Sequence, residues 1–149
     1  MKQTRSTRRL KPLWRCPRCG HRFVTPNLSH SCGRFRLSTH FAGKQPALKK
    51  TFDRFADLAR KCGKVTVYAQ KTRIVIQARV RFASAIVRKD WLDAALWLKH
   101  RATHPSLARV EDFGSLGFYH HFRLTSPSDL DAPLEKLIAQ AYQVGEQRL

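Results

Sequence analysis

Three cysteines and one histidine near the N-terminus have the types and spacing of zinc ligands. Cys16-Pro-Arg-Cys19 places two thiolates in one tight turn, and after ten intervening residues His30-Ser-Cys32 supplies an imidazole and a third thiolate. Structural zinc takes four such ligands in a tetrahedron. Gly20 can adopt a positive φ, which lets the backbone curl around the second sulfur. We therefore predict a structural Zn²⁺ knuckle with Cys16, Cys19, His30 and Cys32 as ligands.

Other uses of these residues stay open. His40 is the second choice for the fourth ligand, whereas His21 would strain the turn after Cys19. Disulfides are the alternative to a metal, but we expect a reducing cytosol. A redox role for the Cys-x-x-Cys pair lacks the βαβ surroundings of a thioredoxin-like site. Cys62 is predicted to be a small core residue, which leaves three cysteines for the metal and makes a histidine necessary.

The positive charge is concentrated in the first two-thirds of the chain. The net charge is +19, and residues 1–50 contain thirteen Lys or Arg and no Asp or Glu. This asymmetry favours a polyanion, so we predict a nucleic-acid partner, either DNA or RNA. Solubility alone is the other explanation of the high pI. The predicted contacts are Arg5, Arg8, Arg9, Lys11, Arg15, Arg18, Arg22, Arg34, Arg36, Lys71, Arg73, Arg79 and Arg81.

The chain has no apolar run of the roughly 18 residues that span a bilayer, and no apolar segment follows the basic N-terminus. We therefore expect a cytoplasmic protein that does not associate with a membrane. An Arg-rich start is also found in transit peptides, but Cys16 leaves no room for a cleavage region. The predicted organisation is a flexible basic tail over residues 1–13, the zinc knuckle over 14–37 and one α+β domain over 38–149.

Hydrophobic periodicity predicts the fold class of that domain: α+β, with an antiparallel sheet of four to five strands flanked by an N-terminal and a C-terminal helix. The first helix covers 47–62, with a short earlier turn that Ser38 caps. Asp131 caps the closing helix, which ends near Gly145. Residues 100–117 are polar and are interpreted as a long loop. The predicted strands are 65–69, 73–77, 80–87, 91–98 and 118–124.

One face of this sheet is predicted to be basic and partly aromatic. In the second strand, alternation assigns Ile74 and Ile76 to the core and Arg73, Val75 and Gln77 to the other face. With Tyr68 and Lys71 nearby, that face could hold phosphates by charge and bases by stacking. A solvated outer face is the alternative. Continued alternation assigns Val80, Phe82 and Ile86 to the core and Arg79 and Arg81 to the basic face.

Adjacent histidines in the last strand point to opposite faces. We predict His120 to be a core histidine and His121, which shares its face with Tyr119 and Arg123, to be the functional candidate. The acids between the two helices are Asp90, Asp93, Glu111 and Asp112, and the order of elements offers no clear way to gather them around Mg²⁺. The catalytic residues are therefore unknown, and whether the protein is an enzyme stays open.

Three classes of function follow. The leading hypothesis is a zinc-stabilised nucleic-acid-binding module. The alternative is a small-ligand-binding domain or an enzyme with a purely structural zinc, and a protein-interaction adaptor is the third class. The possible ligand site consists of His40, Tyr68, Lys71, Arg73 and His121.

The chain resembles a known family over roughly residues 38–145. His40-Phe-Ala-Gly-Lys44, Lys71-Thr-Arg-Ile74, Val80-Arg-Phe82 and Ser126-Pro-Ser-Asp-Leu-Asp131 are similar to the uncharacterised domain of unknown function 5655, sometimes labelled "predicted transport protein". The resemblance implies that His40 belongs to the domain, which favours His30 as the zinc ligand. Many members have a Gly-His-Trp-Gly turn where this chain has Gly114-Ser-Leu-Gly117, so a role of that histidine does not transfer. The family supplies no activity.

Overall fold

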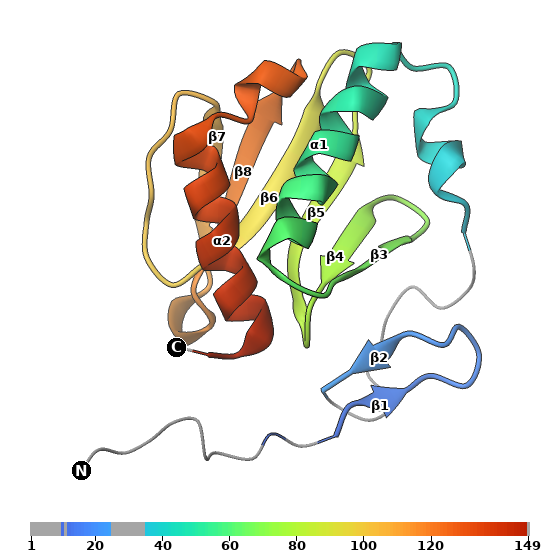
Figure 1. Cartoon of the computed structure of the whole chain (residues 1–149), viewed down its shortest axis with the longest axis vertical. Helices are drawn as coiled ribbons and strands as arrows, with labels where there is room; N and C mark the ends of the chain where they lie inside the picture. Colours follow the sequence, from blue (N-terminus) through green and yellow to red (C-terminus); the bar gives the residue numbers. More distant parts are fainter. Residues whose placement is uncertain (1–9, 11, 25–34, 149) are drawn as a thin grey trace.

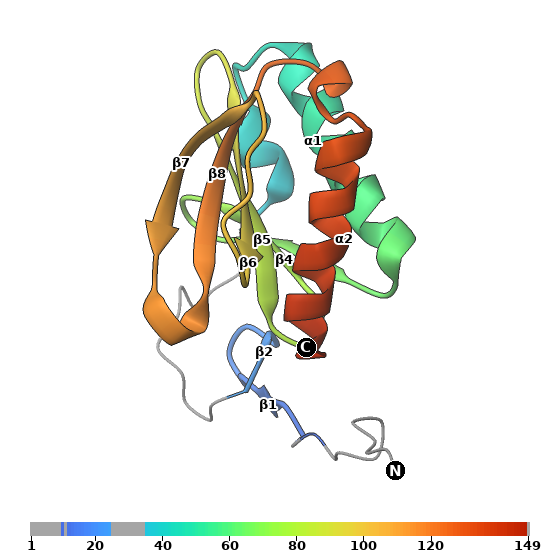
Figure 2. The same ribbon diagram turned by 90° about the vertical axis from the view of Figure 1, so that its left-hand side faces the viewer.

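The computed structural model describes residues 10, 12–24 and 35–148, which form a small N-terminal hairpin and a two-layer α+β unit (Figure 1). Helices α1 (Pro46–Cys62) and α2 (Ala132–Glu146) lie side by side on one face of a six-stranded antiparallel sheet. Figure 2 shows the two layers from the side. The described elements leave the other face of the sheet without a helix, and we call it the open face.

The sheet has six strands where the sequence predicts four to five. Their order is β3-β4-β5-β6-β8-β7. The additional strand, β7, lies within the segment 100–117 that we interpreted as a loop. It pairs only with β8, at the edge of the sheet, and an edge strand can expose both of its faces, so no apolar alternation marks it in the sequence. The bounds are β3 (Thr66–Ala69), β4 (Ile74–Gln77), β5 (Arg81–Val87), β6 (Leu92–Leu98), β7 (Leu107–Asp112) and β8 (Phe118–Leu124).

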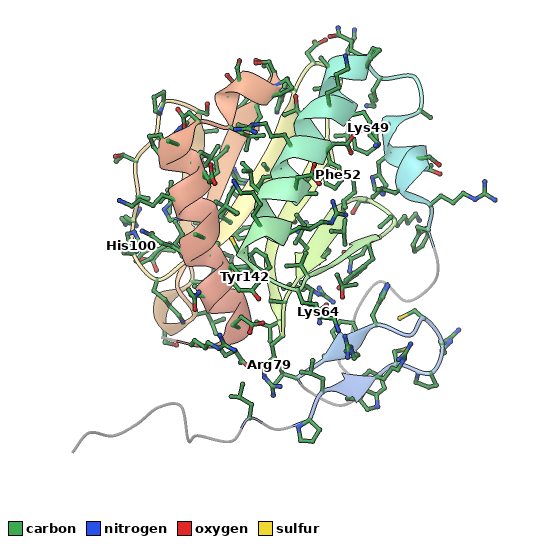
Figure 3. All side chains as sticks on the ribbon, in the orientation of Figure 1. Lys49, Phe52, Lys64, Arg79, His100 and Tyr142 are labelled. Atoms are coloured by element: carbon green, nitrogen blue, oxygen red, sulfur yellow. The ribbon has the colours of Figure 1, made fainter. Side chains whose placement is uncertain are left out.

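The two predicted helices are confirmed. Pro46 occupies the first turn of α1, where a missing N–H costs nothing, and the apolar positions of the helix are buried. The side chain of Asp131 caps α2 by accepting a hydrogen bond of 3.0 Å from the Leu134 N–H. Phe52 of α1 and Tyr142 of α2 belong to the core between helices and sheet (Figure 3). The short earlier turn is a 3₁₀ helix, η2 (Leu37–Phe41), whose N-cap is Arg36 rather than Ser38.

A β-bulge in β5 changes which side chains reach the open face. Ile76 pairs with Ala83 but Gln77 pairs with Arg81, so Phe82 is an extra residue. Phe82 faces the core and Arg81 the open face, as predicted. From Ala83 onward, the extra residue exchanges which side chains of β5 face the core and which face the open side. Ile86 consequently pairs with Asp93 on the open face instead of joining the core.

Two further residues near the bulge depart from simple alternation. Val80 lines a hollow on the open side together with Trp97 instead of facing the core. The Arg79 side chain lies at the end of α2, where its Nε donates a hydrogen bond of 2.7 Å to Gln147 Oε1 (Figure 3). Arg79 therefore does not join Arg81 on the basic face. None of the described helices is long and apolar enough to cross a membrane.

Candidate functional site

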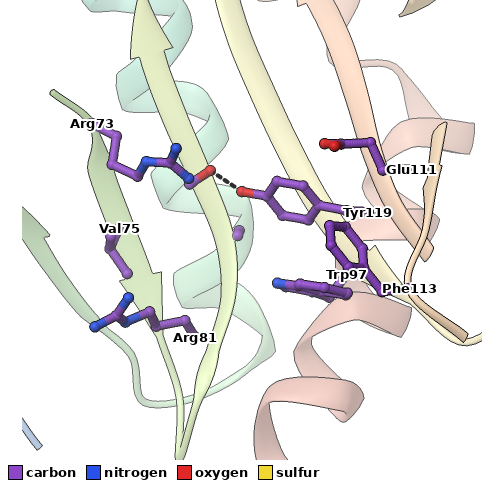
Figure 4. A pocket seen from close by; sticks show the side chains of 9 residues that line it. Arg73, Val75, Arg81, Trp97, Glu111, Phe113 and Tyr119 are labelled. Carbon is purple, nitrogen blue, oxygen red and sulfur yellow. Dashed lines mark hydrogen bonds between the residues drawn. The ribbon is translucent and has the colours of Figure 1, made fainter. Parts of the chain in front are cut away.

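The open face carries a hollow with aromatic and basic walls. Trp97 of β6 lies beside Tyr119 of β8, with ring centroids 4.8 Å apart, and beside Phe113, at 5.2 Å. Arg73 and Arg81 approach from the β4–β5 side, so the two kinds of side chain border the same space of about 350 Å³ (Figure 4). We call this space the first hollow. Flat aromatic rings and guanidinium groups around one cavity suit a ligand with both a ring and negative charge.

The polar groups of the first hollow are held in place by the sheet. Ser84 and Tyr119 form a short hydroxyl–hydroxyl hydrogen bond across β6 (Figure 4). Burial raises the pKa of Tyr119 above its ordinary value, although Ser84 and Arg73 act in the opposite direction. Tyr119 therefore stays a neutral donor and acceptor. One terminal nitrogen of Arg81, Nη2, is buried without a hydrogen-bond partner among the described residues.

A second hollow of about 400 Å³ lies further along the open face. The Arg123 guanidinium stacks over the Trp91 ring at 4.1 Å from its centroid, a cation–π contact. Arg88 and Arg109 also line this space. Together the two hollows are lined by five arginines and only two acids, Asp93 and Glu111.

Both acids are held by His121, where the two hollows meet. His121 Nε2 lies 2.6 Å from Glu111 Oε1, and Nδ1 lies 3.3 Å from Asp93 Oδ1. The hydrogen bond to His121 is the largest cause that lowers the pKa of Glu111 below its usual value, followed among the favourable causes by Arg109. The open face thus holds an Asp93–His121–Glu111 array, with one carboxylate oxygen near each ring nitrogen.

This array could not be predicted from the sequence, because its two acids come from different strands. Asp93 is on β6 and Glu111 on β7, and β8 lies between them with His121. The detectable signal was the alternation of β8, which assigns His121 to the face of Tyr119 and Arg123. The partners of His121 were hidden because β7 was interpreted as a loop.

His120 and His121 divide between core and open face as predicted. His120 is completely buried, and its Nε2 accepts a hydrogen bond of 2.9 Å from the Ala102 N–H while Nδ1 lies 3.2 Å from the Phe118 carbonyl oxygen. These contacts describe a neutral ring. Burial is the main cause that lowers the pKa of His120. His120 is therefore a satisfied core residue.

The described half of the predicted zinc knuckle is a tight hairpin. Strands β1 (Trp14–Arg15) and β2 (Arg22–Phe23) pair around a turn in which the Gly20 N–H donates to the Cys16 carbonyl at 2.8 Å. Gly20 has a φ of 80°, the positive value expected from sequence. Cys16 and Cys19 are buried, at 4% and 5% exposure, with Phe23 and Trp14 packed around them.

This half fits a metal site in the arrangement of its thiols, which the turn places together inside a very small apolar cluster. His30 and Cys32, the other two predicted ligands, lie outside the described residues. Within residues 10, 12–24 and 35–148, no group of three or more potential ligands gathers around one point. The zinc assignment stays a prediction.

The hairpin packs against the edge of the sheet beside the first hollow. His21 stacks on Tyr68 of β3 with ring centroids 3.7 Å apart. Gln77 Nε2 donates a hydrogen bond of 2.7 Å to the Arg22 carbonyl, and the Arg81 guanidinium lies 5.0 Å from the centroid of the Phe23 ring. Phe23 and Arg81 also border a third hollow of about 420 Å³, which shares Trp97 with the first hollow.

The residues of the predicted ligand site are not brought together. His40 Nε2 lies 2.8 Å from the Gln70 carbonyl oxygen, beside the end of β3, whereas His121 is on β8. Four inter-strand spacings separate these strands in the sheet order, or about 19 Å. Lys71 is exposed in the β3–β4 turn, and Tyr68 stacks under the hairpin. Arg73 alone of the five reaches the first hollow, and His121 lines the second.

The thirteen predicted nucleic-acid contacts are not gathered in one place. Arg18, Arg36 and Lys71 are exposed, and Arg79 lies at the end of α2. Arg5, Arg8, Arg9, Lys11 and Arg34 lie outside the described residues. Arg15 and Arg22 border a hollow between the hairpin and β3, and Arg73 and Arg81 line the first hollow. Sequence reasoning did not include three arginines that line the second hollow: Arg88, directly after β5, Arg109 in β7 and Arg123 in β8.

The comparisons with known proteins give a family without an activity. A family model described as a domain of unknown function, DUF5655, matches residues 37–145. No curated protein and no solved structure matches this sequence.

Proposed function

The chain belongs to the DUF5655 family, which brings no activity with it, and from the geometry of the open face we propose that the protein binds single-stranded nucleic acid. The observation that carries the proposal is the first hollow. Arg73 and Arg81 border the same space as the Trp97–Tyr119–Phe113 cluster. Unpaired nucleotides need both kinds of contact, a cation for the phosphate and a flat ring for the base.

The three hollows offer a path for several nucleotides. The third and first hollows share Arg81 and Trp97, and the first and second meet at the Glu111–His121 contact. Trp97 and Trp91 provide one aromatic surface on each side of that contact. Paired strands do not expose their base faces for stacking, so the aromatic surfaces favour a single strand over a duplex.

Zinc in the knuckle is the second part of the proposal. The described cluster of Cys16, Cys19, Phe23 and Trp14 is too small to hold a module together by apolar burial alone. Zinc bound by Cys16, Cys19, His30 and Cys32 would supply the missing stability. It would also hold Arg22 at the third hollow and Arg15 at the hollow between the hairpin and β3. Thiolate ligands require reduced cysteines, so we place the protein in the cytosol.

The decisive experiment measures binding by fluorescence anisotropy with a labelled single-stranded oligonucleotide of about 12 nucleotides. Trp97→Ala should weaken binding about 5-fold to 150-fold, because stacking on one aromatic side chain contributes about 1–3 kcal/mol per base. Arg73→Ala should weaken it as well. Lys50→Ala is the matched control: Lys50 is exposed on α1, on the opposite side of the molecule, and its removal changes the net charge equally.

Equal effects of Arg73→Ala and Lys50→Ala would show that only overall charge matters and would contradict an interface on the open face. No binding of any single strand near physiological salt would reject the proposed function and would favour the small-ligand alternative. A duplex that binds more tightly than the single strand would also contradict the role of the hollows.

A further inference from the structure

The Glu111–His121 pair occupies a special position on the open face. Glu111 lines the first hollow and His121 lines the second, and their side chains touch at 2.6 Å. Trp97 of β6 and Trp91, directly before that strand, are six residues apart, or about 20 Å. A strand that stacks one base near each of them would carry an intervening phosphodiester over this pair. A carboxylate and an imidazole at a phosphodiester are a general base and a general acid.

We propose that Glu111 and His121 cleave single-stranded RNA by promoting attack of a 2′-hydroxyl on the adjacent phosphorus. The inference rests on the proposed function, because the hollows must first hold the strand. It adds a reaction and a choice of RNA over DNA.

The surroundings of the pair suit these roles. The Arg109 guanidinium lies 3.5 Å from Glu111 Oε1, and Arg109 is the residue of β7 that pairs with His121 of β8. From this position the guanidinium can stabilise the negative charge of a pentavalent phosphorus. Asp93 holds the far nitrogen of His121 and is itself 3.8 Å from Arg88 Nη2. The lowered pKa of Glu111 keeps its carboxylate ionised near neutral pH. His121 is buried except for 10% of its side chain, whereas Glu111 is 38% exposed and can move aside to admit a phosphate.

The reaction needs no additional reagent. Glu111 takes the proton of the 2′-hydroxyl while the 2′ oxygen forms a bond to phosphorus. The bond from phosphorus to the 5′ oxygen breaks, and the leaving oxygen receives the Nε2 proton of the His121 imidazolium. The products are one strand ending in a 2′,3′-cyclic phosphate and one strand beginning with a 5′-hydroxyl.

The direct contact of the pair then restores the starting state. After cleavage Glu111 holds a proton and His121 Nε2 lacks one. Since these atoms lie 2.6 Å apart once the phosphate leaves, the proton passes from Glu111 to His121. DNA lacks the 2′-hydroxyl and can bind without being cut.

The test uses the full-length protein and three labelled single strands of one sequence: RNA, DNA and 2′-O-methyl RNA. Binding is measured by anisotropy, and products are analysed on denaturing gels and by mass spectrometry. We expect all three strands to bind, only RNA to be cut, and the new 3′ ends to carry a cyclic phosphate.

Glu111→Gln and His121→Asn should each lower the rate of cleavage by about 10² to 10⁴, the usual contribution of one acid or base. Both variants should bind 2′-O-methyl RNA within about threefold of the wild type, which shows that they fold. Glu135→Gln removes a carboxylate on α2 and should leave the rate unchanged.

Asp93 is a positioning residue and needs a different readout. Asp93→Asn should shift the pH profile of kcat/KM, because Asp93 contacts the imidazole that supplies the proton to the leaving oxygen. The charged and titratable groups around His121 are Arg88 after β5, Asp93 of β6, Arg109 and Glu111 of β7, and Tyr119 and Arg123 of β8.

Four outcomes would overturn the inference. RNA that binds but stays intact would reject cleavage and leave the proposed function standing. Equal cleavage by the wild type and by Glu111→Gln, purified in the same way, would identify a contaminating nuclease. Cleavage of DNA would exclude the 2′-hydroxyl reaction. If none of the three strands binds, the proposed function fails together with the inference.

Discussion

Gly145 of α2 lies directly against the ring of Phe82, the extra residue of the β5 bulge. A Cβ atom on Gly145 would be 2.5 Å from Phe82 Cδ1, and the Phe82 Cβ and Cγ atoms would be at 2.9 Å. The Gly145 carbonyl also accepts hydrogen bonds from the N–H groups of Arg79 and Val80, at 3.0 and 2.9 Å. The end of α2 thus holds the bulge, which in turn directs Arg81 to the open face.

Gly145→Ala should destabilise the protein, although alanine normally favours a helix. The methyl group cannot be accommodated without moving Phe82, and overpacking of this kind costs about 1–3 kcal/mol. Urea unfolding should show a lower midpoint with an unchanged m-value. Gln140→Ala, at an exposed position of the same helix, is the control and should change stability by less than about 0.5 kcal/mol. A variant as stable as the wild type would mean that α2 packs less closely on the bulge.

Glu111→Gln should reduce stability near neutral pH but not in acid. The pKa of Glu111 is lowered in the folded protein, chiefly by His121, so between the folded and unfolded pKa values the unfolded chain binds more protons. The Glu111 carboxylate therefore stabilises the folded protein at pH values above the ordinary carboxyl pKa. This stabilisation is lost as the pH falls through the lowered pKa of the folded state. Because Glu111 is more than one-third exposed, the difference should stay below about 1 kcal/mol. Urea unfolding of the wild type and of Glu111→Gln at pH about 3 and 7 measures the difference in stability. A difference that is larger in acid than at neutral pH would contradict this prediction.

The helices and the core strands follow from local patterns, whereas the site does not. Leu48, Phe52 and Phe55 repeat at helical spacing and Asp131 is a strong N-cap, so both helices could be located from sequence. The faces of His120 and His121 follow from the twofold period of a strand. Each of these features depends only on neighbours in the chain.

The features that could not be predicted depend on long-range packing. The bulge at Phe82 is permitted by Gly145, which lies more than sixty residues later, and it reverses the position of Ile86. β7 has weak alternation because it lies at an edge. Without β7 the position of Glu111 was unknown, so the pair with His121 could not be inferred.

The freshly purified protein should contain about one zinc per chain, and Cys16→Ser or Cys32→Ser should lose it. Structural zinc contributes roughly 10–16 kcal/mol to finger-sized units, so chelation should unfold the hairpin while leaving the α+β unit, with its own core, folded. Metal analysis and NMR spectra before and after chelation measure both effects. A zinc content near zero, or full retention in Cys32→Ser, would remove the predicted site.

His30→Ala should weaken zinc binding, whereas His40→Ala should leave the zinc content unchanged. The structure gives His40 a different partner, the Gln70 carbonyl oxygen at 2.8 Å, so its loss should affect the β3–β4 turn instead. Metal analysis of the two variants decides between them. Zinc loss in His40→Ala with retention in His30→Ala would mean that the fourth ligand was assigned incorrectly.

The salt dependence of binding should separate the contribution of charge from that of stacking. If about five phosphates are neutralised, the slope of log affinity against log salt should be about −3.5 for a single strand. Removing residues 1–11 should flatten this slope, because Arg5, Arg8, Arg9 and Lys11 are lost together.

Trp97→Ala should lower the affinity at every salt concentration and leave the slope unchanged, because stacking on an uncharged ring releases no counterions from the strand. Any sequence preference should survive the truncation, since phosphate contacts position a protein without reading bases. Anisotropy titrations at several salt concentrations, with wild type, truncation and Trp97→Ala in parallel, give all three slopes. A steep slope that persists without residues 1–11 would move the phosphate contacts from the tail to the arginines of the open face.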